Sequence, residues 1–216
     1  MKICRTKYNW KRCNKKWQRK IEKMTNPKGY IIHLKNHQKS VEWSNHALTT
    51  GQKFGWKLEL YDGVDGTKEK LEDYKVKIYP HNKKCVRLLS RPGTQGCFLS
   101  QYKLWKKCFK ENKEICVFEH DVVFKKPFSI EQEFSDILKF EGFQPTKPMP
   151  VGQWWEGARA YCLKPSGAKK LLDFVKHKGA MPADWCINNG ILDVKFDLNN
   201  KVTFDSKKFS FTKDLK

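Results

Sequence analysis

The feature that most constrains the fold is an amphipathic segment that runs almost directly into a short apolar one. Residues 96–112 repeat large aromatic side chains at helical spacing, and residues 115–118 read Ile-Cys-Val-Phe with no polar member. The first pattern predicts a helix and the second a buried strand. A helix that precedes a strand buried on both faces is typical of an α/β fold, in which helices cover a largely parallel sheet.

The same alternation continues along the chain. We expect further strands at 30–34, 56–61 and 160–163, further helices at 40–53, 130–140, 165–178 and 181–189, and short strands in the basic tail. The segment 67–93 is less regular, and 143–153 reads as a proline-rich loop. The predicted fold is therefore α/β, with a mostly parallel central sheet flanked by helices. In such sheets, ligands bind at the carboxyl ends of the strands.

Two carboxylates, Glu119 and Asp121, end the apolar segment at a spacing of two residues. In an extended strand, residues at this spacing project to the same side. Like charges held together repel each other, and a divalent cation relieves that repulsion. Carboxylate oxygens suit Mg²⁺ or Mn²⁺, which can also bridge phosphate oxygens. The pattern predicts a metal site for a nucleotide-linked substrate, and the alternative of acids that merely end a strand stays open.

The charge balance indicates an anionic partner. The chain has 216 residues, with 44 Lys and Arg against 23 Asp and Glu, for a formal net charge of +21. Phosphate groups, a membrane surface and nucleic acid all fit such a charge, which says nothing about the fold. No recognisable nucleic-acid-binding module accompanies it, so the sequence disfavours a nucleic-acid partner.

The first 28 residues differ from the rest, with eleven basic residues and one acid. Apolar residues recur there at steps of three and four, on one stripe of a helix: Trp10, Cys13, Trp17, Ile21 and Met24. A basic amphipathic helix with tryptophan on its apolar face is typical of a membrane-surface anchor, although the stripe could equally pack on the domain as core. We expect a basic arm at 1–28 and a single domain at 29–216.

Eight cysteines are present, and no two of them have the C-x-x-C spacing of zinc ribbons or thioredoxin-like motifs. The start of the chain does not read as a signal peptide, so we expect reduced thiols in a cytoplasmic protein. No apolar run approaches the roughly 18–20 residues of a membrane span. Peripheral contact with a membrane through the arm remains open.

Six short blocks lie in order between residues 29 and 190. They are 30–34 (YIIHL), 61–66 (YDGVDG), 93–105 (GTQGCFLSQYKLW), 119–122 (EHDV), 160–172 (AYCLKPSGAKKLL) and 182–185 (PADW). Together they resemble glycosyltransferase family 25, the group that includes bacterial lipooligosaccharide galactosyltransferases and collagen galactosyltransferases. Two positions depart from the family pattern: His120 replaces the middle acid of an E-D-D-V motif, and Gln101 replaces a histidine.

The resemblance implies a GT-A-like, Rossmann-related fold that binds a nucleotide sugar. It also implies a transferase that inverts the anomeric carbon, commonly with a UDP-linked donor such as UDP-galactose and with Mn²⁺ or Mg²⁺. The expected acceptor is a glycan or lipid-linked glycan, as in lipopolysaccharide biosynthesis. Because of the two departures, a catalytically inactive relative that binds glycan or nucleotide sugar stays open as an alternative, beside a basic nucleic-acid-binding protein.

The resemblance and the residue chemistry together give the candidate site. Glu119 and Asp121 are expected to hold the metal, and the expected donor-binding residues are Asp62, Asp65, Arg91, Gly93, Gly96, Ser100 and Glu119. Asp184 is the candidate general base, with a helix N-cap as the alternative role. Glu156 is the competing base.

The other site residues also have plainer alternatives. Asp62 and Asp65 could simply close a turn, and the two glycines could serve a structural turn instead of a phosphate at a helix start. Trp154, Trp155 and Trp185 could stack on a sugar or pack in the core.

Overall fold

The computed structural model describes residues 26–140 and 157–204. Most of the basic arm, the whole proline-rich loop, Glu156, Trp154 and Trp155 therefore lie outside the described residues. The division into an arm at 1–28 and a domain at 29–216 stays a prediction.

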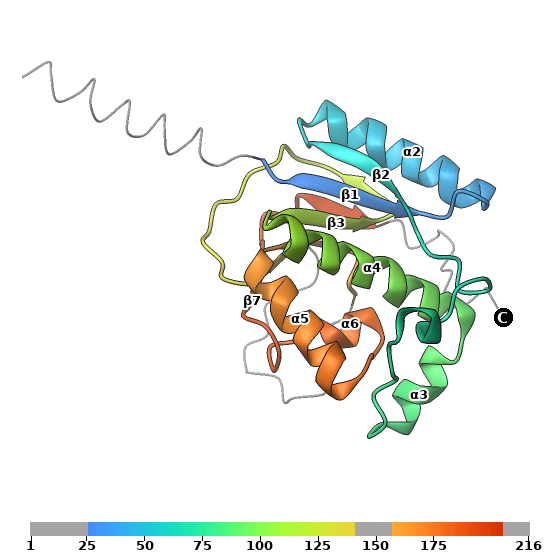
Figure 1. Ribbon diagram of the computed structural model, residues 1–216. Helices are drawn as coiled ribbons and strands as arrows, with labels where there is room; N and C mark the ends of the chain where they lie inside the picture. Colours follow the sequence, from blue (N-terminus) through green and yellow to red (C-terminus); the bar gives the residue numbers. More distant parts are fainter. Residues whose placement is uncertain (1–25, 141–156, 205–216) are drawn as a thin grey trace, which may run out of the picture.

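Strands and helices alternate along the described chain (Figure 1). The strands are β1 Lys28–His33, β2 Leu58–Asp62, β3 Ile115–Glu119, β4 Val122–Phe124, β5 Ile137–Lys139, β6 Ala160–Leu163, β7 Val194–Phe196 and β8 Val202–Phe204. The helices are α2 Gln38–Lys53, a 3-10 helix η1 Leu71–Tyr74, α3 Lys83–Leu89, α4 Pro92–Glu111, α5 Pro165–Lys178 and α6 Ala183–Cys186.

Six of the strands form one sheet in the order β2-β1-β3-β6-β5-β7. β1 runs parallel to both β2 and β3, and β5 runs parallel to β7, whereas β6 is antiparallel to both of its neighbours. Five of the six strands therefore share one direction, with β6 alone reversed. The predicted α/β class with a mostly parallel central sheet is confirmed.

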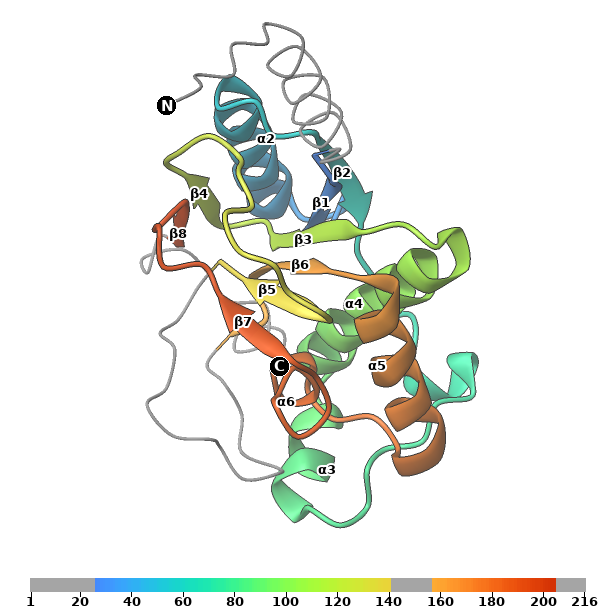
Figure 2. The same ribbon diagram turned by 90° about the vertical axis from the view of Figure 1, so that its left-hand side faces the viewer.

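The sheet separates two apolar layers. Ile115 and Val117 of β3 face a cluster that includes residues of α4 and α5, while Cys116 and Phe118 face a cluster with α2 and Trp56. This alternation follows from the two-residue period of a strand. Figure 1 shows α2 above the sheet and α4 and α5 below it, and in Figure 2 the small β4–β8 pair lies beside α2.

Most predicted elements are confirmed within a few residues, but one is wrong. The expected helix at 130–140 is absent, and residues 137–139 form β5 instead. The buried Asp136 explains the difference, because its Oδ2 accepts hydrogen bonds from Lys170 Nζ and the Asp193 amide, and its carbonyl accepts the Lys164 amide. These partners come from the N-cap and the body of α5 and from the approach to β7, so tertiary pairing overrides a helical apolar spacing.

The irregular segment 67–93 contains η1 and α3. The Asn82 side chain accepts the amides of Lys84 and Cys85 at 2.9 and 3.1 Å, which is the contact of an N-cap residue. Asparagine before an apolar run was the available sequence signal. Similarly, α4 begins at Pro92, in the favoured first-turn position for proline, and not at Gly96.

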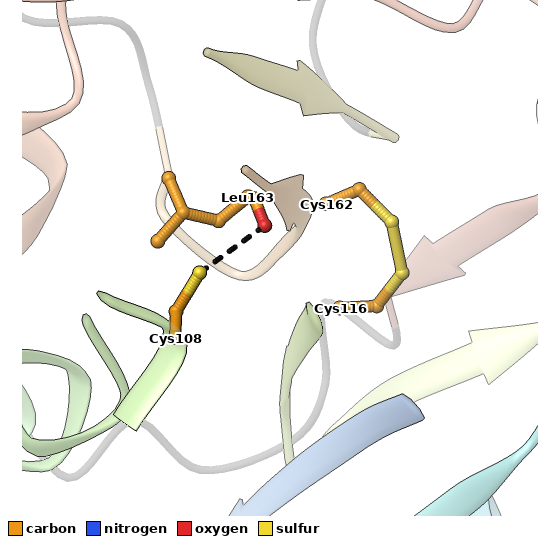
Figure 3. The surroundings of a disulfide bond; sticks show 4 residues. All are labelled: Cys108, Cys116, Cys162 and Leu163. Carbon is orange, nitrogen blue, oxygen red and sulfur yellow. Dashed lines mark hydrogen bonds between the residues drawn. A yellow bond between two sulfur atoms is a disulfide. The ribbon is translucent and has the colours of Figure 1, made fainter. Parts of the chain in front are cut away.

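The prediction of reduced thiols is wrong for one pair, because Cys116 and Cys162 form a disulfide between β3 and β6 (Figure 3). The two residues are register partners, and their Cα atoms lie 4.1 Å apart. In the same ladder, three residue pairs beyond the cysteines, the Glu119 amide donates a hydrogen bond to the Arg159 carbonyl. Because hydrogen-bonded and non-hydrogen-bonded pairs alternate, the cysteines occupy the narrower, non-hydrogen-bonded kind, which brings their side chains together.

Other cysteines of the described chain are free: Cys85, Cys97, Cys108 and Cys186. The Cys108 thiol donates to the Leu163 carbonyl at 3.5 Å, beside the disulfide (Figure 3). None of the described helices has the length and apolar character to cross a membrane. The cytoplasmic setting stays a prediction, and the disulfide removes the support that it drew from reduced thiols.

The disulfide should stabilise the domain measurably. Its cysteines are 46 residues apart, and a cross-link of that span is expected to contribute about 4 kcal/mol by restricting the unfolded chain. The double variant Cys116→Ala/Cys162→Ala should lose about this much free energy of unfolding in urea. A phosphine reductant should lower the stability of the wild type and leave that of the double variant unchanged. Equal sensitivity of both proteins to the reductant would contradict the assignment.

Candidate functional site

The carboxyl ends of three parallel strands, β1, β2 and β3, meet at one edge of the sheet (Figure 1). His33 ends β1 and is the register partner of Asp62, which ends β2. The His33 ring lies 3.2 Å from the Asp62 carboxylate, and Lys35 Nζ donates to its other oxygen at 2.9 Å. The hydrogen bond from Lys35 is the main cause that lowers the Asp62 pKa. Asp62, at the end of β2, therefore bonds to His33 and Lys35, at and just after the end of β1.

The turn after β2 packs closely on the first turns of α4. Ser100 Oγ accepts the Val64 amide at 2.8 Å and donates to the Gly96 carbonyl at 2.6 Å. A Cβ atom at Gly96 would lie 2.5 Å from the Val64 carbonyl, and one at Gly66 would lie 1.9 Å from the Pro92 carbonyl. Close backbone approach thus accounts for Gly96 and Ser100, as the plainer alternative has it.

Asp65 and the two remaining donor-site candidates lie around the same turn. The Asp65 carboxylate accepts the Thr67 amide at 3.0 Å and the Thr67 hydroxyl at 2.6 Å, which closes a turn. Gly93 is buried near the start of α4, and the exposed Arg91 occupies the N-cap position of that helix. A role of these residues in donor binding stays a prediction.

Glu119, at the end of β3, meets the thiol of Cys97 from α4. The Cys97 thiol donates to Glu119 Oε1 at 3.7 Å. Its pKa is raised well above the ordinary value, first by burial and then by the negative charges of Glu119 and Asp184. The charges of the predicted metal ligand and of the predicted base therefore both act on this thiol, although the two residues lie 65 positions apart in the sequence.

Asp184 belongs to the first turn of α6, whose N-cap residue is Pro182. The alternative reading of Asp184 as an N-cap is therefore wrong. Trp185 is only 6% exposed, and the Lys84 ammonium lies 5.7 Å from the centre of its ring. This burial favours core packing over sugar stacking for Trp185.

The two residues after Glu119 form a turn, so β3 does not continue through them. The rule that places strand residues i and i+2 on one side consequently does not apply to Asp121, which is half-buried in that turn. His120 is buried and stacks on Trp43 of α2, with ring centroids 5.5 Å apart and an interplanar angle of 12°. An imidazole at this position could serve as a metal ligand or face the core, and the structure shows His120 packed against the α2 layer.

Gln101, the second departure from the family pattern, lies inside the core. The Trp105 indole donates to the Tyr161 hydroxyl at 2.9 Å, which donates to Gln101 Oε1 at 2.9 Å. Gln101 Nε2 then donates to the Ala158 carbonyl at 3.1 Å and lies 3.9 Å from Cys97 Sγ. Gln101 and Tyr161 are fully buried, so the Gln101 amide has a structural role. It contacts Cys97, which in turn contacts Glu119.

The two candidate carboxylates, Glu119 and Asp121, are too few to enclose a metal ion by themselves. The described residues hold no group of three or more His, Cys, Asp or Glu that could cage a metal ion. Mg²⁺ and similar ions are commonly held by one or two carboxylates together with substrate phosphates and water. Glu119, at the end of β3, and Asp121, in the turn after it, would offer two such oxygen donors, and a metal at this position stays a prediction.

The comparison with protein families bears directly on this arrangement. The family model described as "Glycosyltransferase family 25 (LPS biosynthesis protein)" matches residues 26–146, more than half of the chain. The chain belongs to glycosyltransferase family 25. The resemblance seen in the sequence is thereby confirmed. The matched region contains Asp62, Glu119 and Asp121 and ends before Asp184.

One curated relative is a "Glycosyltransferase 25 family member" of Aedes aegypti. It is 25% identical over 182 residues, which cover 71% of this chain and 29% of the relative. The chain therefore spans less than a third of that protein.

Two solved structures are similar at low identity. Mouse xyloside xylosyltransferase 1 in its apo form matches with a TM-score of 0.41 at 11% identity, over 79% of this chain and 84% of that one. A glycosyltransferase involved in glycosylation of the major capsid of PBCV-1 matches with a TM-score of 0.36 at 9% identity, over 69% and 67%. Likenesses of this size add nothing to the fold assignment, which rests on the strand order.

Cys97 is a residue of this site that the sequence analysis did not single out, because a lone cysteine within an amphipathic helix resembles any small apolar residue. A signal was present, since Cys97 and Gln101 are four positions apart and share one face of α4. Gln101 was already notable as a departure from the family pattern.

The contact between Cys97 and Glu119 predicts how fast the thiol reacts. The charge of Glu119 raises the Cys97 pKa, so Glu119→Gln should lower that pKa and increase the thiolate fraction near pH 8. Because the thiolate is the nucleophile, alkylation of Cys97 by iodoacetamide should become severalfold faster. Peptide mass spectrometry would follow this one site. Glu111→Gln, a remote exposed carboxylate, is the matched control, and equal rates in both variants would contradict the contact.

Proposed function

We propose that the protein transfers a sugar from a nucleotide-sugar donor, UDP-linked, to a hydroxyl of a glycan or lipid-linked glycan, with inversion at the anomeric carbon. The observation that carries this proposal is that Cys97 contacts Glu119 at the carboxyl end of β3 and that the charge of Asp184 also acts on this thiol, in a member of glycosyltransferase family 25. Strand ends of this kind are where α/β sheets bind their ligands.

Inverting transfer requires a base for the acceptor hydroxyl on the side of the sugar opposite the leaving nucleotide. Asp184 is the proposed base, because its charge acts on the same thiol that contacts Glu119, and because it comes from α6 and not from the sheet. A carboxylate within hydrogen-bond reach of the hydroxyl would accept its proton as the new bond forms. Two acidic groups on different elements can thus serve the two sides of one sugar.

The leaving nucleotide diphosphate needs positive charge. Glu119 and Asp121 would hold Mn²⁺ or Mg²⁺ together with the donor phosphates, and the bound metal would neutralise the developing charge. Arg91 is exposed at the start of the 20-residue helix α4. A helix N-terminus and a guanidinium both favour phosphate, so Arg91 is proposed to bind the diphosphate.

Cys97 and Gln101 support the carboxylate in this scheme. The thiol with a raised pKa stays protonated near neutral pH, and it can therefore keep donating its S–H to Glu119. Gln101 contacts the thiol from the buried side. The two side chains would orient Glu119 without touching the donor.

The metal assignment is tested by the loss of one carboxylate. Purified protein would be incubated with UDP-, GDP- and CMP-sugars, with and without Mn²⁺, and nucleotide release measured. We expect Mn²⁺-dependent release from one donor, and Asp121→Asn should abolish it while the melting temperature stays unchanged. Asp193→Asn is the control for removal of a charge elsewhere. Normal release by Asp121→Asn would remove Asp121 from the site.

The base assignment predicts a separate loss. Asp184→Ala should lower the rate of transfer to an acceptor by roughly 10²–10⁴-fold, the usual contribution of a positioned base, with little change in donor binding. Transfer assays that are stopped at fixed times, with the donor found above, measure the transfer rate. Isothermal titration measures donor affinity, so the effect on the rate is separated from any effect on donor binding. If Asp184→Ala transfers normally and Glu156→Ala does not, the role belongs to Glu156.

A further inference from the structure

A second concave site lies away from the strand ends, between the C-terminal half of α5, the middle of α4 and the segment 75–81. Its cavity volume is about 780 Å³, within the range of ligand-binding pockets. The segment 75–81 is fixed to the end of α5, because the Tyr79 amide donates to the Ala180 carbonyl at 2.8 Å and the Ala180 amide to the Lys77 carbonyl at 2.7 Å. Backbone hydrogen bonds thus build the wall of this cavity.

The rim of the cavity is strongly basic. Five lysines line it, from three separate parts of the chain: Lys75, Lys77, Lys106, Lys176 and Lys178. Two histidines, His81 and His177, lie among them, and Asp173 is the single acid of the lining. The Asp173 carboxylate already accepts Lys169, which lies outside the lining, at 2.5 Å. Among the described residues, no ion pair joins any of the five lysines to a carboxylate within 4.0 Å.

Helix stabilisation explains only part of this charge. Lys176 and Lys178 belong to the last turn of α5, where cations are favourable to the helix dipole. Lys75, Lys77 and Lys106 belong to other elements and gain nothing from that dipole. Because helix stabilisation accounts for only two of the five lysines, their convergence on one cavity favours an anionic ligand.

The floor of the cavity is apolar. Val76, Ile78, Leu172 and Val175 line it together with the half-buried ring of Tyr102. The Lys106 ammonium lies 5.5 Å from the centre of that ring. An aromatic ring beneath ammonium groups suits a ligand with an apolar face and anionic substituents, such as a saccharide ring.

We propose that this basic cavity binds an anionic saccharide, one that carries sulfate, phosphate or carboxylate groups, at a site separate from sugar transfer. A bilayer fits less well, because the apolar residues form the floor of a hollow. The large hydrophobic side chains that are exposed in the described chain, Val86, Phe109 and Leu198, are not part of its lining. The proposal does not require transferase activity, since binding alone tests it.

The test is a titration with a heparin-derived tetrasaccharide at near-physiological salt, with uncharged maltotetraose as the ligand control. The pocket variant is Lys75→Gln/Lys77→Gln/Lys178→Gln. The matched control is Lys53→Gln/Lys57→Gln/Lys110→Gln, which removes the same charge from exposed positions elsewhere. We expect the pocket variant to lose about tenfold or more in affinity and the control to stay within about twofold, since contact charges dominate such binding.

Three outcomes would overturn the proposal. An equal loss in both variants would show that binding follows overall charge, and no loss in either would place binding elsewhere. Loss of binding by the pocket variant to vesicles of phosphatidylcholine and phosphatidylglycerol, with saccharide binding intact, would assign the lysines to phospholipid. Nucleotide release from the sugar donor, measured on the same variants, should be unchanged, so failure of the proposed transferase reaction would be seen separately.

Discussion

The arrangement of the site depends on a chain of buried hydrogen bonds between α4 and β6. The Trp105 indole, the Tyr161 hydroxyl and the Gln101 amide are linked in series, and Gln101 also holds the Ala158 carbonyl just before β6. In a low-dielectric interior, such bonds are costly to break, so they fix how α4 lies along the sheet. Cys97, one turn from Gln101, is thereby placed against Glu119. The geometry of the strand-end carboxylate is thus set by the core.

The features that the sequence predicted well are those encoded locally. The helix at 165–178 and the strand at 160–163 appear with the expected bounds, because a proline at the first turn and a wholly apolar run are strong local signals. Features made by distant partners were not predictable in this way. The extended backbone around Asp136 depends on α5 and β7, and the Cys116–Cys162 bond depends on a strand register. The approach of Asp184 to Glu119 likewise depends on how α6 packs against α4.

The two departures from the family pattern take on a different meaning once they are placed in the fold. Gln101 satisfies a buried hydroxyl and a buried carbonyl, and His120 packs on an indole of α2. Both substitutions therefore lie in packing contacts. His120 takes the place of an acid, but the two flanking carboxylates, Glu119 and Asp121, are retained. The alternative of an inactive binding relative drew its support from these two positions. That support is weakened, because a residue inside the core can differ from the family pattern while the reacting groups stay the same.

The local charge of the candidate site opposes the overall charge of the protein. A net charge of +21 attracts an anionic nucleotide sugar at long range, whereas Glu119 and Asp184 present negative charge where the diphosphate would arrive. Cys97 contacts Glu119 and stays protonated, so it supplies a hydrogen bond but no positive charge. On the proposed mechanism, a donor that enters with its divalent cation resolves this conflict, because the cation offsets the carboxylates and the phosphates together. A nucleotide without a bound cation would be repelled by the same carboxylates.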